Sequence, residues 1–244
     1  MDADPPIFAF AGGFGGAGDH ALLSEFIFMK PKLLDLYCCG GGAGRGYELA
    51  GFDVTGVDNV PQPKHRGKFI LADAIEYVLQ HGNEYDFIHA SPPCQAYSLA
   101  SMQHRKSGKD YPDLIQKTRE ALQKTGKPYV IENVPGAPLI DPITLCGSMF
   151  QSATGGILRT YRHRIFESNL PLTAPPCFHV YPQAKMGRRA KPHEFIQFVG
   201  HYTDAEIVRE MLGLEWLSKK EIAQCVPPQY TEFLGRQVLT YLSF

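Results

Sequence analysis

Short hydrophobic runs alternate with amphipathic stretches through the first half of the chain. The runs predict buried strands at Leu33–Tyr37, Phe52–Val57, Phe69–Leu71, Phe87–Ala90 and Tyr129–Glu132. The stretches between them predict helices from the glycines at 40–42 to Ala50, over Asp73–Gln80 and over Leu114–Lys124. Because strands and helices alternate, the strands should lie parallel in one sheet. The pattern therefore predicts an α/β fold with a doubly wound, mostly parallel sheet.

The regular alternation ends in the second half of the chain. One more strand is expected at Tyr161–Phe166, a polar and basic loop at 103–110, and helices at Asp204–Leu212 and, after Pro227-Pro228, at Tyr230–Leu242. Residues 170–193 are rich in proline and basic side chains and lack periodicity, which is typical of an inserted loop. We therefore divide the chain into a disordered leader at 1–29, an α/β domain at 30–168, a small insert at 169–203, and C-terminal helices at 204–244 that pack back on the α/β domain.

Composition narrows the class of protein. The 244 residues suit one large domain with a small appendage, because single cores stop growing at roughly 250 residues. Basic and acidic residues nearly cancel, 24 against 25, so any nucleic-acid surface must be a local cluster. No membrane helix or signal peptide is predicted, and the six cysteines are expected to be reduced thiols of a cytoplasmic protein. There is no CxxC pair, and Cys177 with His179 gives only two ligands, so no metal site is expected.

A glycine-rich turn follows the first predicted strand. Gly40, Gly41 and Gly42 precede the first helix, and Asp58 ends the second strand, as in sheets that bind a nucleoside at this edge. The dinucleotide spacing fails, because Arg45 or Tyr47 stands where its last glycine would be. An adenosine cofactor without a pyrophosphate fits better, and S-adenosylmethionine is the leading candidate. The alternative is a tight turn that binds nothing.

A second group of candidate residues follows the next strands. Cys94 comes after Ser91-Pro92-Pro93 at a strand end, where a nucleophile would face the ligand crevice, and the nearby His89, His104, Arg105 and Lys106 are expected to raise its thiolate fraction. Glu132 ends the neighbouring strand. Arg162 and Arg164 alternate on the strand predicted at Tyr161–Phe166, which would place both guanidinium groups on one face. Each residue alone could be structural, but a thiol, a carboxyl and two arginines in this order favour an enzyme.

These residues resemble the motifs of the cytosine-C5 DNA methyltransferases over about residues 32–242. The run from Asp35 to Gly42 is similar to the family's cofactor motif, with Cys39 in place of a glycine. Pro93-Cys94-Gln95 is similar to its Pro-Cys-Gln motif, and Glu132-Asn133-Val134 to its Glu-Asn-Val motif. Arg162-x-Arg164 fits its Gln-x-Arg-x-Arg motif, with Thr160 at the Gln position. Gln224 to Pro228 is similar to the closing motif, without its Gly-Asn pair.

The resemblance implies a role for each matching residue. It implies the fold of S-adenosylmethionine-dependent methyltransferases with a small target-recognition insert. The catalytic residues would be Cys94, Glu132, Arg162 and Arg164. The cofactor would be S-adenosylmethionine, bound by Asp35, Tyr37, Gly40, Gly41, Gly42, Asp58, Asn59, Asp73, Ala74 and Pro93. Double-stranded DNA would meet Gln95, Ser98, Arg105, Lys106, Lys185, Arg188 and Arg189.

The implied reaction is methylation of carbon 5 of cytosine through a covalent adduct of Cys94, on a base flipped out of the duplex. The loop 96–110 would close over that base. Between residues 159 and 191 seven basic residues stand against the single acid Glu167, and this segment is expected to read the DNA. We expect a monomer in the cytoplasm of a bacterial or phage-infected cell. Two alternatives remain: methylation of cytosine in RNA with the same residues, and an idle DNA-binding subunit.

Overall fold

The fold is described from a computed structural model. It describes residues 29–98, 101–185, 187–200 and 202–242. The leader expected at 1–29 lies outside these residues except for its last position, and the loop expected at 96–110 is described apart from residues 99 and 100.

One seven-stranded sheet forms the centre of the molecule, in the order β3-β2-β1-β4-β5-β7-β6. Its parallel part consists of β1 (Lys32–Leu36), β2 (Asp53–Asp58), β3 (Lys68–Leu71), β4 (Phe87–Ala90) and β5 (Tyr129–Asn133). The strand β7 (Arg164–Ser168) runs antiparallel to β5, and β6 (Ile143–Leu145) runs antiparallel to β7. The prediction of a mostly parallel sheet is therefore confirmed.

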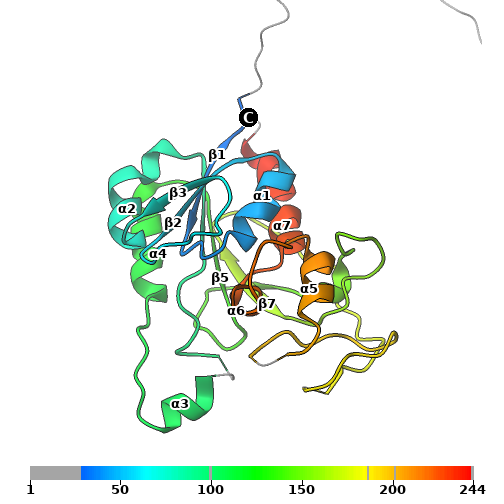
Figure 1. The fold of residues 1–244 in the computed structure, drawn as a ribbon. Helices are drawn as coiled ribbons and strands as arrows, with labels where there is room; N and C mark the ends of the chain where they lie inside the picture. The colour runs from blue at the N-terminus through cyan, green and yellow to red at the C-terminus, as the bar shows by residue number, and fades with distance from the viewer. Residues whose placement is uncertain (1–28, 99–100, 186, 201, 243–244) are drawn as a thin grey trace, which may run out of the picture.

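Helices cover both faces of this sheet (Figure 1). Alternate strand residues face α1 (Gly42–Ala50) and α7 (Pro228–Leu242) on one side, and α2 (Ala74–His81) and α4 (Ile115–Thr125) on the other. In β1, for example, Leu33 belongs to the first core, whereas Leu34 and Leu36 belong to the second. Strands buried on both faces require the continuous hydrophobic runs seen in the sequence.

Close contact between α1 and α7 joins the two ends of the described chain. A Cβ atom on Gly46 would lie 2.0 Å from the hydroxyl of Thr231, so only glycine allows α7 to approach this closely. Thr231 in turn donates a hydrogen bond to the carbonyl of Ala43 at 2.8 Å. The C-terminal helix thus packs back on the first helix of the sheet domain.

Several elements differ from the prediction. A short helix, α3 (Met102–Lys106), lies within the expected polar loop. The strand predicted at Tyr161–Phe166 begins only at Arg164, so Arg162 precedes it and does not share its face. The strand β6 and the helix α6 (Lys219–Gln224) were not predicted, and neither were the short 3-10 turns at Gly82–Glu84 and Gly147–Met149. The helix predicted at Asp204–Leu212 is α5 (Ala205–Leu212).

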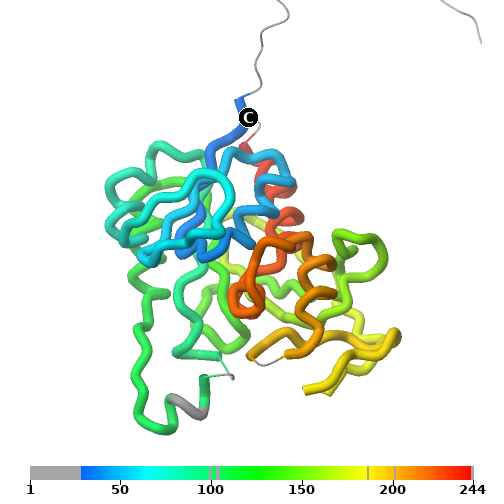
Figure 2. Tube along the Cα trace, in the orientation of Figure 1, coloured from blue at the N-terminus to red at the C-terminus, as the bar shows by residue number. Residues whose placement is uncertain are grey.

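The insert contains neither helix nor strand among its described residues, apart from an isolated bridge between Gln183 and Phe195. In Figure 2 the green segment that includes α3 and the yellow insert both lie in the lower part of the view, below the sheet. Within the described part of the chain, no helix has both the length and the apolar character that a membrane span requires.

Candidate active site

Cys94 lies in a rigid turn just beyond β4. The Asn133 side chain, at the end of β5, donates a hydrogen bond to the Pro92 carbonyl at 2.9 Å and so holds the two prolines before the thiol. The Cys94 carbonyl accepts hydrogen bonds from the backbone amides of Tyr97 and Ser98, which turns the chain sharply after it. The sequence named Asn133 only as part of a motif. The structure gives it a positioning role.

Glu132 is a buried carboxyl group paired with an arginine. Oε1 of Glu132 lies 2.8 Å from Nε of Arg164, and the two side chains are only 7% and 12% exposed. Burial raises the pKa of Glu132, while Arg164, a hydrogen bond from Ser91 and Arg162 lower it, and the net shift is upward. A raised pKa is the direction required of a group that must donate a proton.

The cations near Cys94 are not the expected ones. Burial raises the pKa of the Cys94 thiol, Glu132 raises it further, and Arg164 and Arg162 oppose both. His89 supplies no charge, because burial lowers its pKa to about 3 and its ring is hydrogen bonded to Tyr47 and Ser91. The expectation that nearby basic residues raise the thiolate fraction is therefore wrong for His89, and it stays untested for His104, Arg105 and Lys106. The charges of Arg164 and Arg162 lower the pKa of Cys94.

Arg162 has a different place from its neighbour Arg164. Its guanidinium donates to the carbonyls of Ala223 at 2.7 Å, Cys225 at 3.1 Å and Phe198 at 3.3 Å. Burial lowers its pKa to about 10. The first two carbonyls lie at the end of α6, where the last backbone acceptors of a helix lack internal partners. Arg162 thus ties the C-terminal segment to the insert, in contrast to the expected pair of arginines on one strand face.

The glycine-rich turn adopts an uncommon backbone. Tyr37 and Cys39 have φ values of +60° and +46°, in the left-handed region that favours glycine. Cys39 stands where the resembling motif has a glycine, and the turn keeps a glycine-like conformation there. The Tyr37 hydroxyl is hydrogen bonded to Thr118 on α4 at 2.8 Å.

Three carboxyl groups near this turn differ in their hydrogen-bond partners. Asp58 is buried and accepts hydrogen bonds from the amides of Cys39 at 3.0 Å and Val60 at 2.9 Å. Asp73 is exposed and caps α2 by accepting hydrogen bonds from the amides of Ile75 and Glu76.

Asp35 is the unusual one. It is fully buried, and neither carboxylate oxygen has a hydrogen-bond partner of good geometry, although the group lies against Gly44 in the first turn of α1. Burial raises the pKa of Asp35 to about 8.

The other expected cofactor residues surround the same edge. Gly40 and Gly42 are covered by the C-terminal segment, since a Cβ on them would lie 2.6 Å from Leu217 and 2.7 Å from Cys225. Ala74 is buried as the first residue of α2, Asn59 is exposed, and Pro93 is partly buried.

A cavity of about 140 Å³ opens beside Gly40 and Gly41. His65, Arg66 and Trp216 also line it. The Arg66 guanidinium lies 4.0 Å from the centre of the Trp216 ring. Sequence reasoning missed all three residues, because they come from loops without a recognisable pattern.

The residues expected to bind DNA fall into two groups. Arg105 donates to the carbonyls of Gln95 and Ser98 at 2.6 and 2.8 Å and so braces its own loop. Arg188 forms a two-pronged pair with Glu194 at 2.6 and 2.7 Å, which lowers the pKa of Glu194 to about 2. The side chains expected to bind DNA that are exposed and not held in this way are Lys106, Lys185 and Arg189.

Comparison with known proteins gives a local sequence match and a fold. No protein-family model matches the chain. The type II methyltransferase M.AquIA of Picosynechococcus sp. is 28% identical over 130 residues, covering 44% of this chain and 50% of that protein. The chain thus spans about half the length of this curated relative.

Two solved structures share the architecture. A proposed DNA modification methyltransferase encoded within an E. coli prophage superposes with a TM-score of 0.59 at 14% identity, and S. pombe Dnmt2 methyltransferase with 0.57 at 12%. Each match covers 88% of this chain and 100% of the other. At such identities these matches show the fold alone, which is that of methyltransferases.

Proposed function

We propose that the protein transfers a methyl group from S-adenosylmethionine to carbon 5 of cytosine in duplex DNA. The observation that carries the proposal is one juxtaposition at the carboxyl ends of β4 and β5. There a thiol, Cys94, interacts electrostatically with the buried Glu132 and with Arg164, beyond the same sheet edge as the glycine-rich turn. Methyltransferases are the class that the fold and the local sequence match support.

The residues at the glycine-rich turn fit the cofactor. S-adenosylmethionine carries a positively charged sulfonium and an ammonium group, and the orphaned carboxyl of Asp35 is a buried acceptor suited to a cation. Asp58 would hold the ribose hydroxyls with the acceptor capacity that its two backbone hydrogen bonds leave, because each carboxylate oxygen accepts more than one. Bound there, the cofactor supplies an electrophilic methyl group.

The side chains of this chain would carry out the remaining steps. Carbon 5 of cytosine is a weak nucleophile, so the Cys94 sulfur first bonds to carbon 6 and the thiol proton goes to solvent. Glu132, whose pKa burial raises, donates a proton to N3, while Arg164 stabilises the charge on O2. After methylation, water removes the proton from carbon 5, the carbon–sulfur bond breaks, the released Cys94 thiolate takes a proton from solvent, and N3 returns its proton to Glu132.

The raised pKa of Cys94 gives this mechanism a further requirement. The resting thiol is protonated, so the arginines at 162 and 164 must stabilise the sulfur anion as it forms. Arg162 would act there through its charge, because its Nη1 and Nη2 atoms donate to backbone carbonyls, although its buried Nε has no hydrogen-bond partner. Arg164 would contact the base.

The test uses the purified chain, methyl-labelled cofactor and three substrates: genomic DNA free of 5-methylcytosine, its single-stranded form, and a pool of transfer RNA. Nucleosides are analysed by mass spectrometry. We expect 5-methylcytosine in duplex DNA and none with Cys94→Ala. A duplex containing 5-fluorocytosine should form a covalent adduct through Cys94, because fluorine blocks the last proton removal.

Other outcomes would change the proposal in defined ways. Methylcytosine in RNA but not in DNA would replace the substrate. Binding of DNA without any transfer would indicate an idle subunit. An adduct mapped to Cys38 or Cys146 would overturn the assignment of the nucleophile.

The cofactor site is tested separately by calorimetry. Asp58→Ala should weaken binding of S-adenosylmethionine by roughly 1–3 kcal/mol, the range for losing hydrogen bonds to a charged group. Asp53→Ala provides the matched control, because this carboxylate at the start of β2 pairs with Lys68 and is not an expected cofactor residue. It should leave the affinity unchanged, whereas unchanged affinity in Asp58→Ala would remove Asp58 from the site.

A further inference from the structure

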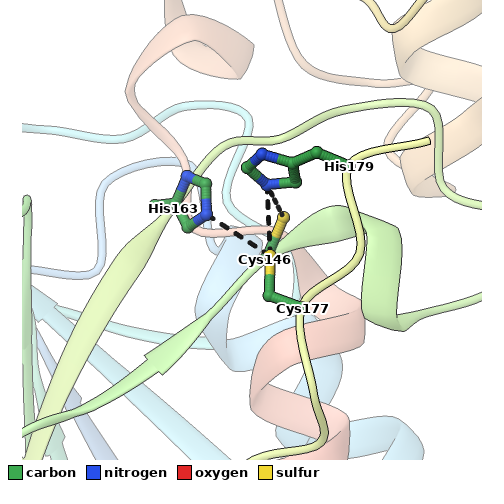
Figure 3. Close-up of side chains that lie close together, drawn as sticks. All are labelled: Cys146, His163, Cys177 and His179. Atoms are coloured by element: carbon green, nitrogen blue, oxygen red, sulfur yellow. Dashed lines mark hydrogen bonds between the residues drawn. The ribbon is translucent and has the colours of Figure 1, made fainter. Parts of the chain in front are cut away.

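Two thiols and two imidazoles converge at the edge of the sheet, outside the site described above. The ligand atoms of Cys146, His163, Cys177 and His179 all lie within 4.8 Å of one another. Figure 3 shows the four side chains pointing toward a common centre. Cys146 follows β6, His163 precedes β7, and the other two belong to the insert. Three segments distant in sequence therefore supply one cluster.

The separations agree with tetrahedral metal coordination. With metal–sulfur bonds of about 2.3 Å and metal–nitrogen bonds of about 2.0–2.1 Å, a tetrahedral centre holds sulfur and nitrogen about 3.5–3.6 Å apart. The distance from Cys177 Sγ to His163 Nε2 is 3.6 Å, and that from Cys146 Sγ to His179 Nε2 is 3.6 Å. Cys177 Sγ to His179 Nε2 is shorter, 3.1 Å.

Hydrogen bonds alone account poorly for this arrangement. Nε2 of His179 faces two sulfur atoms, yet a ring nitrogen has either one proton or one lone pair in that direction. The Cys177 sulfur likewise faces two ring nitrogens and has one proton to share. A metal ion between the four atoms would accept one lone pair from each of them at once.

The surroundings hold the ligands in place. The Tyr161 ring lies against the His179 ring, with ring centres 3.9 Å apart. The Phe195 ring stacks on Tyr161, with ring centres 4.1 Å apart. The Ser148 hydroxyl lies 3.1 Å from the Cys146 sulfur, where it can donate to a thiolate. Such outer contacts orient the ligands of metal sites.

We propose that Cys146, His163, Cys177 and His179 form a structural zinc site. A set of two thiolates and two neutral imidazoles in tetrahedral geometry is typical of zinc, and four protein ligands leave no open position for catalysis. The sequence led to the opposite expectation, because it showed only Cys177 and His179 as neighbours. The proposal does not depend on which base, or which nucleic acid, the protein methylates.

The site would fasten the insert to the sheet. Cys177 and His179 lie in the insert, which has no helix or strand among its described residues. The regular backbone hydrogen bonds of helices and sheets therefore do not hold it. His163 stands between Arg162 and Arg164, and a metal bound there would also fix the strand that presents Arg164 to Glu132. Loss of the metal should therefore loosen the insert first and the active site second.

The first measurement is the metal content of the full chain. Protein purified without added metal and passed over a gel-filtration column should carry about one zinc per chain by elemental analysis. Replacement of zinc by cobalt(II) should give the strong visible absorption of a tetrahedral site with thiolate ligands. Cys177→Ser and His179→Ala are exposed and should fold, yet each should lose most of the zinc and this spectrum.

His193→Ala is the matched control, because His193 is an exposed histidine of the same insert outside the cluster. It should keep the zinc content of the wild type. Limited trypsin digestion supplies a readout that does not use activity. Chelation should speed cleavage after Lys185 or Arg189 at least several-fold, and added zinc should restore protection.

Three results would overturn the proposal. The first is a wild-type protein that retains no zinc after gel filtration in a zinc-containing buffer. The second is retention of as much zinc by the Cys177 and His179 variants as by His193→Ala. The third is a disulfide between Cys146 and Cys177, found by mass spectrometry in freshly purified protein.

Discussion

Two buried arginine–glutamate pairs lie on opposite faces of the sheet and differ in how completely they are bonded. Arg119 meets Glu167 through two hydrogen bonds of 2.6 and 2.7 Å, and the remaining capacity of Glu167 accepts the Ile140 amide at 2.8 Å. Arg164 meets Glu132 through one contact of 2.8 Å, and Oε1 of Glu132 lacks a hydrogen bond of good geometry. The first pair is satisfied and the second is not.

The difference separates a structural role from a chemical one. Arg119 connects α4 to β7, and its hydrogen bond with Glu167 raises the pKa of Arg119. In the other pair, burial outweighs Arg164 and raises the pKa of Glu132. A buried carboxyl group that is incompletely paired holds its proton more tightly and keeps hydrogen-bonding capacity for a substrate. Asp35, buried and orphaned at the glycine-rich turn, belongs with Glu132 in this respect.

The largest effect is expected from breaking the satisfied pair. Arg119→Ala would leave the Glu167 carboxylate buried without its partner and should lower the free energy of unfolding by about 3–5 kcal/mol. Chemical denaturation measures this. Arg236→Ala breaks an exposed pair with Glu232 and should cost less than about 1 kcal/mol. If the folded fraction of Arg119→Ala also lost methyl transfer, the pair would not be purely structural.

Breaking the Arg164–Glu132 pair should lower turnover strongly and change stability little. Glu132→Gln keeps the shape but cannot donate an acid proton, and turnover should fall about 100- to 1000-fold, as when one transition-state donor is lost. Stability should change by less than about 1 kcal/mol. A loss of stability comparable to that of Arg119→Ala would remove the contrast between the two pairs.

The pH dependence of stability sharpens this test. The pKa of Glu132 is raised above its ordinary value of 4.5. Its neutral form therefore supports the fold fully below about that pH, and the support is lost as the pH rises through the folded pKa. Glu132→Gln has no such loss. Its stability relative to the wild type should increase over that window, as measured by thermal midpoints across pH.

Asp35→Asn extends the same reasoning to the glycine-rich turn with a smaller effect. Burial raises the pKa of Asp35 from 3.8 to about 8, so wild-type stability should decline between these values, and that of the variant should not. The expected difference is on the order of 1–3 kcal/mol, as for an unsatisfied buried polar group.

Cofactor binding gives an independent readout for Asp35. A cation beside this carboxyl would lower its pKa, so binding of S-adenosylmethionine near pH 7 should release a proton. Calorimetry in buffers of different ionisation enthalpy detects that release. Equal proton release by Asp35→Asn and the wild type would show that Asp35 does not face the cofactor.

Sequence reasoning predicted the parallel part of the fold because its strands are continuous buried runs. It missed β6 at Ile143–Leu145, which is too short to show periodicity, and placed the start of β7 three residues early. It singled out Cys94, Glu132 and Asp58 as candidate site residues from their places at or just after strand ends. It could not find the cluster around Cys146, whose members meet only in three dimensions.

Two neighbouring arginines of the insert show a similar contrast between a paired and an exposed side chain. Arg188 was expected to meet DNA, but Glu194, three residues beyond the counted segment, holds its guanidinium. Arg189 is exposed. Arg189→Ala should therefore lower DNA affinity and reduce the salt slope of binding by about 0.9 if a phosphate contact is lost, or relax preference at one base position if a base contact is lost. Arg188→Ala should leave the slope nearly unchanged and increase hydrogen exchange around Glu194. If Arg188→Ala changed the salt slope and Arg189→Ala did not, the Arg188–Glu194 pair would have to open on DNA. An arginine that is paired in the free protein would then still contact DNA.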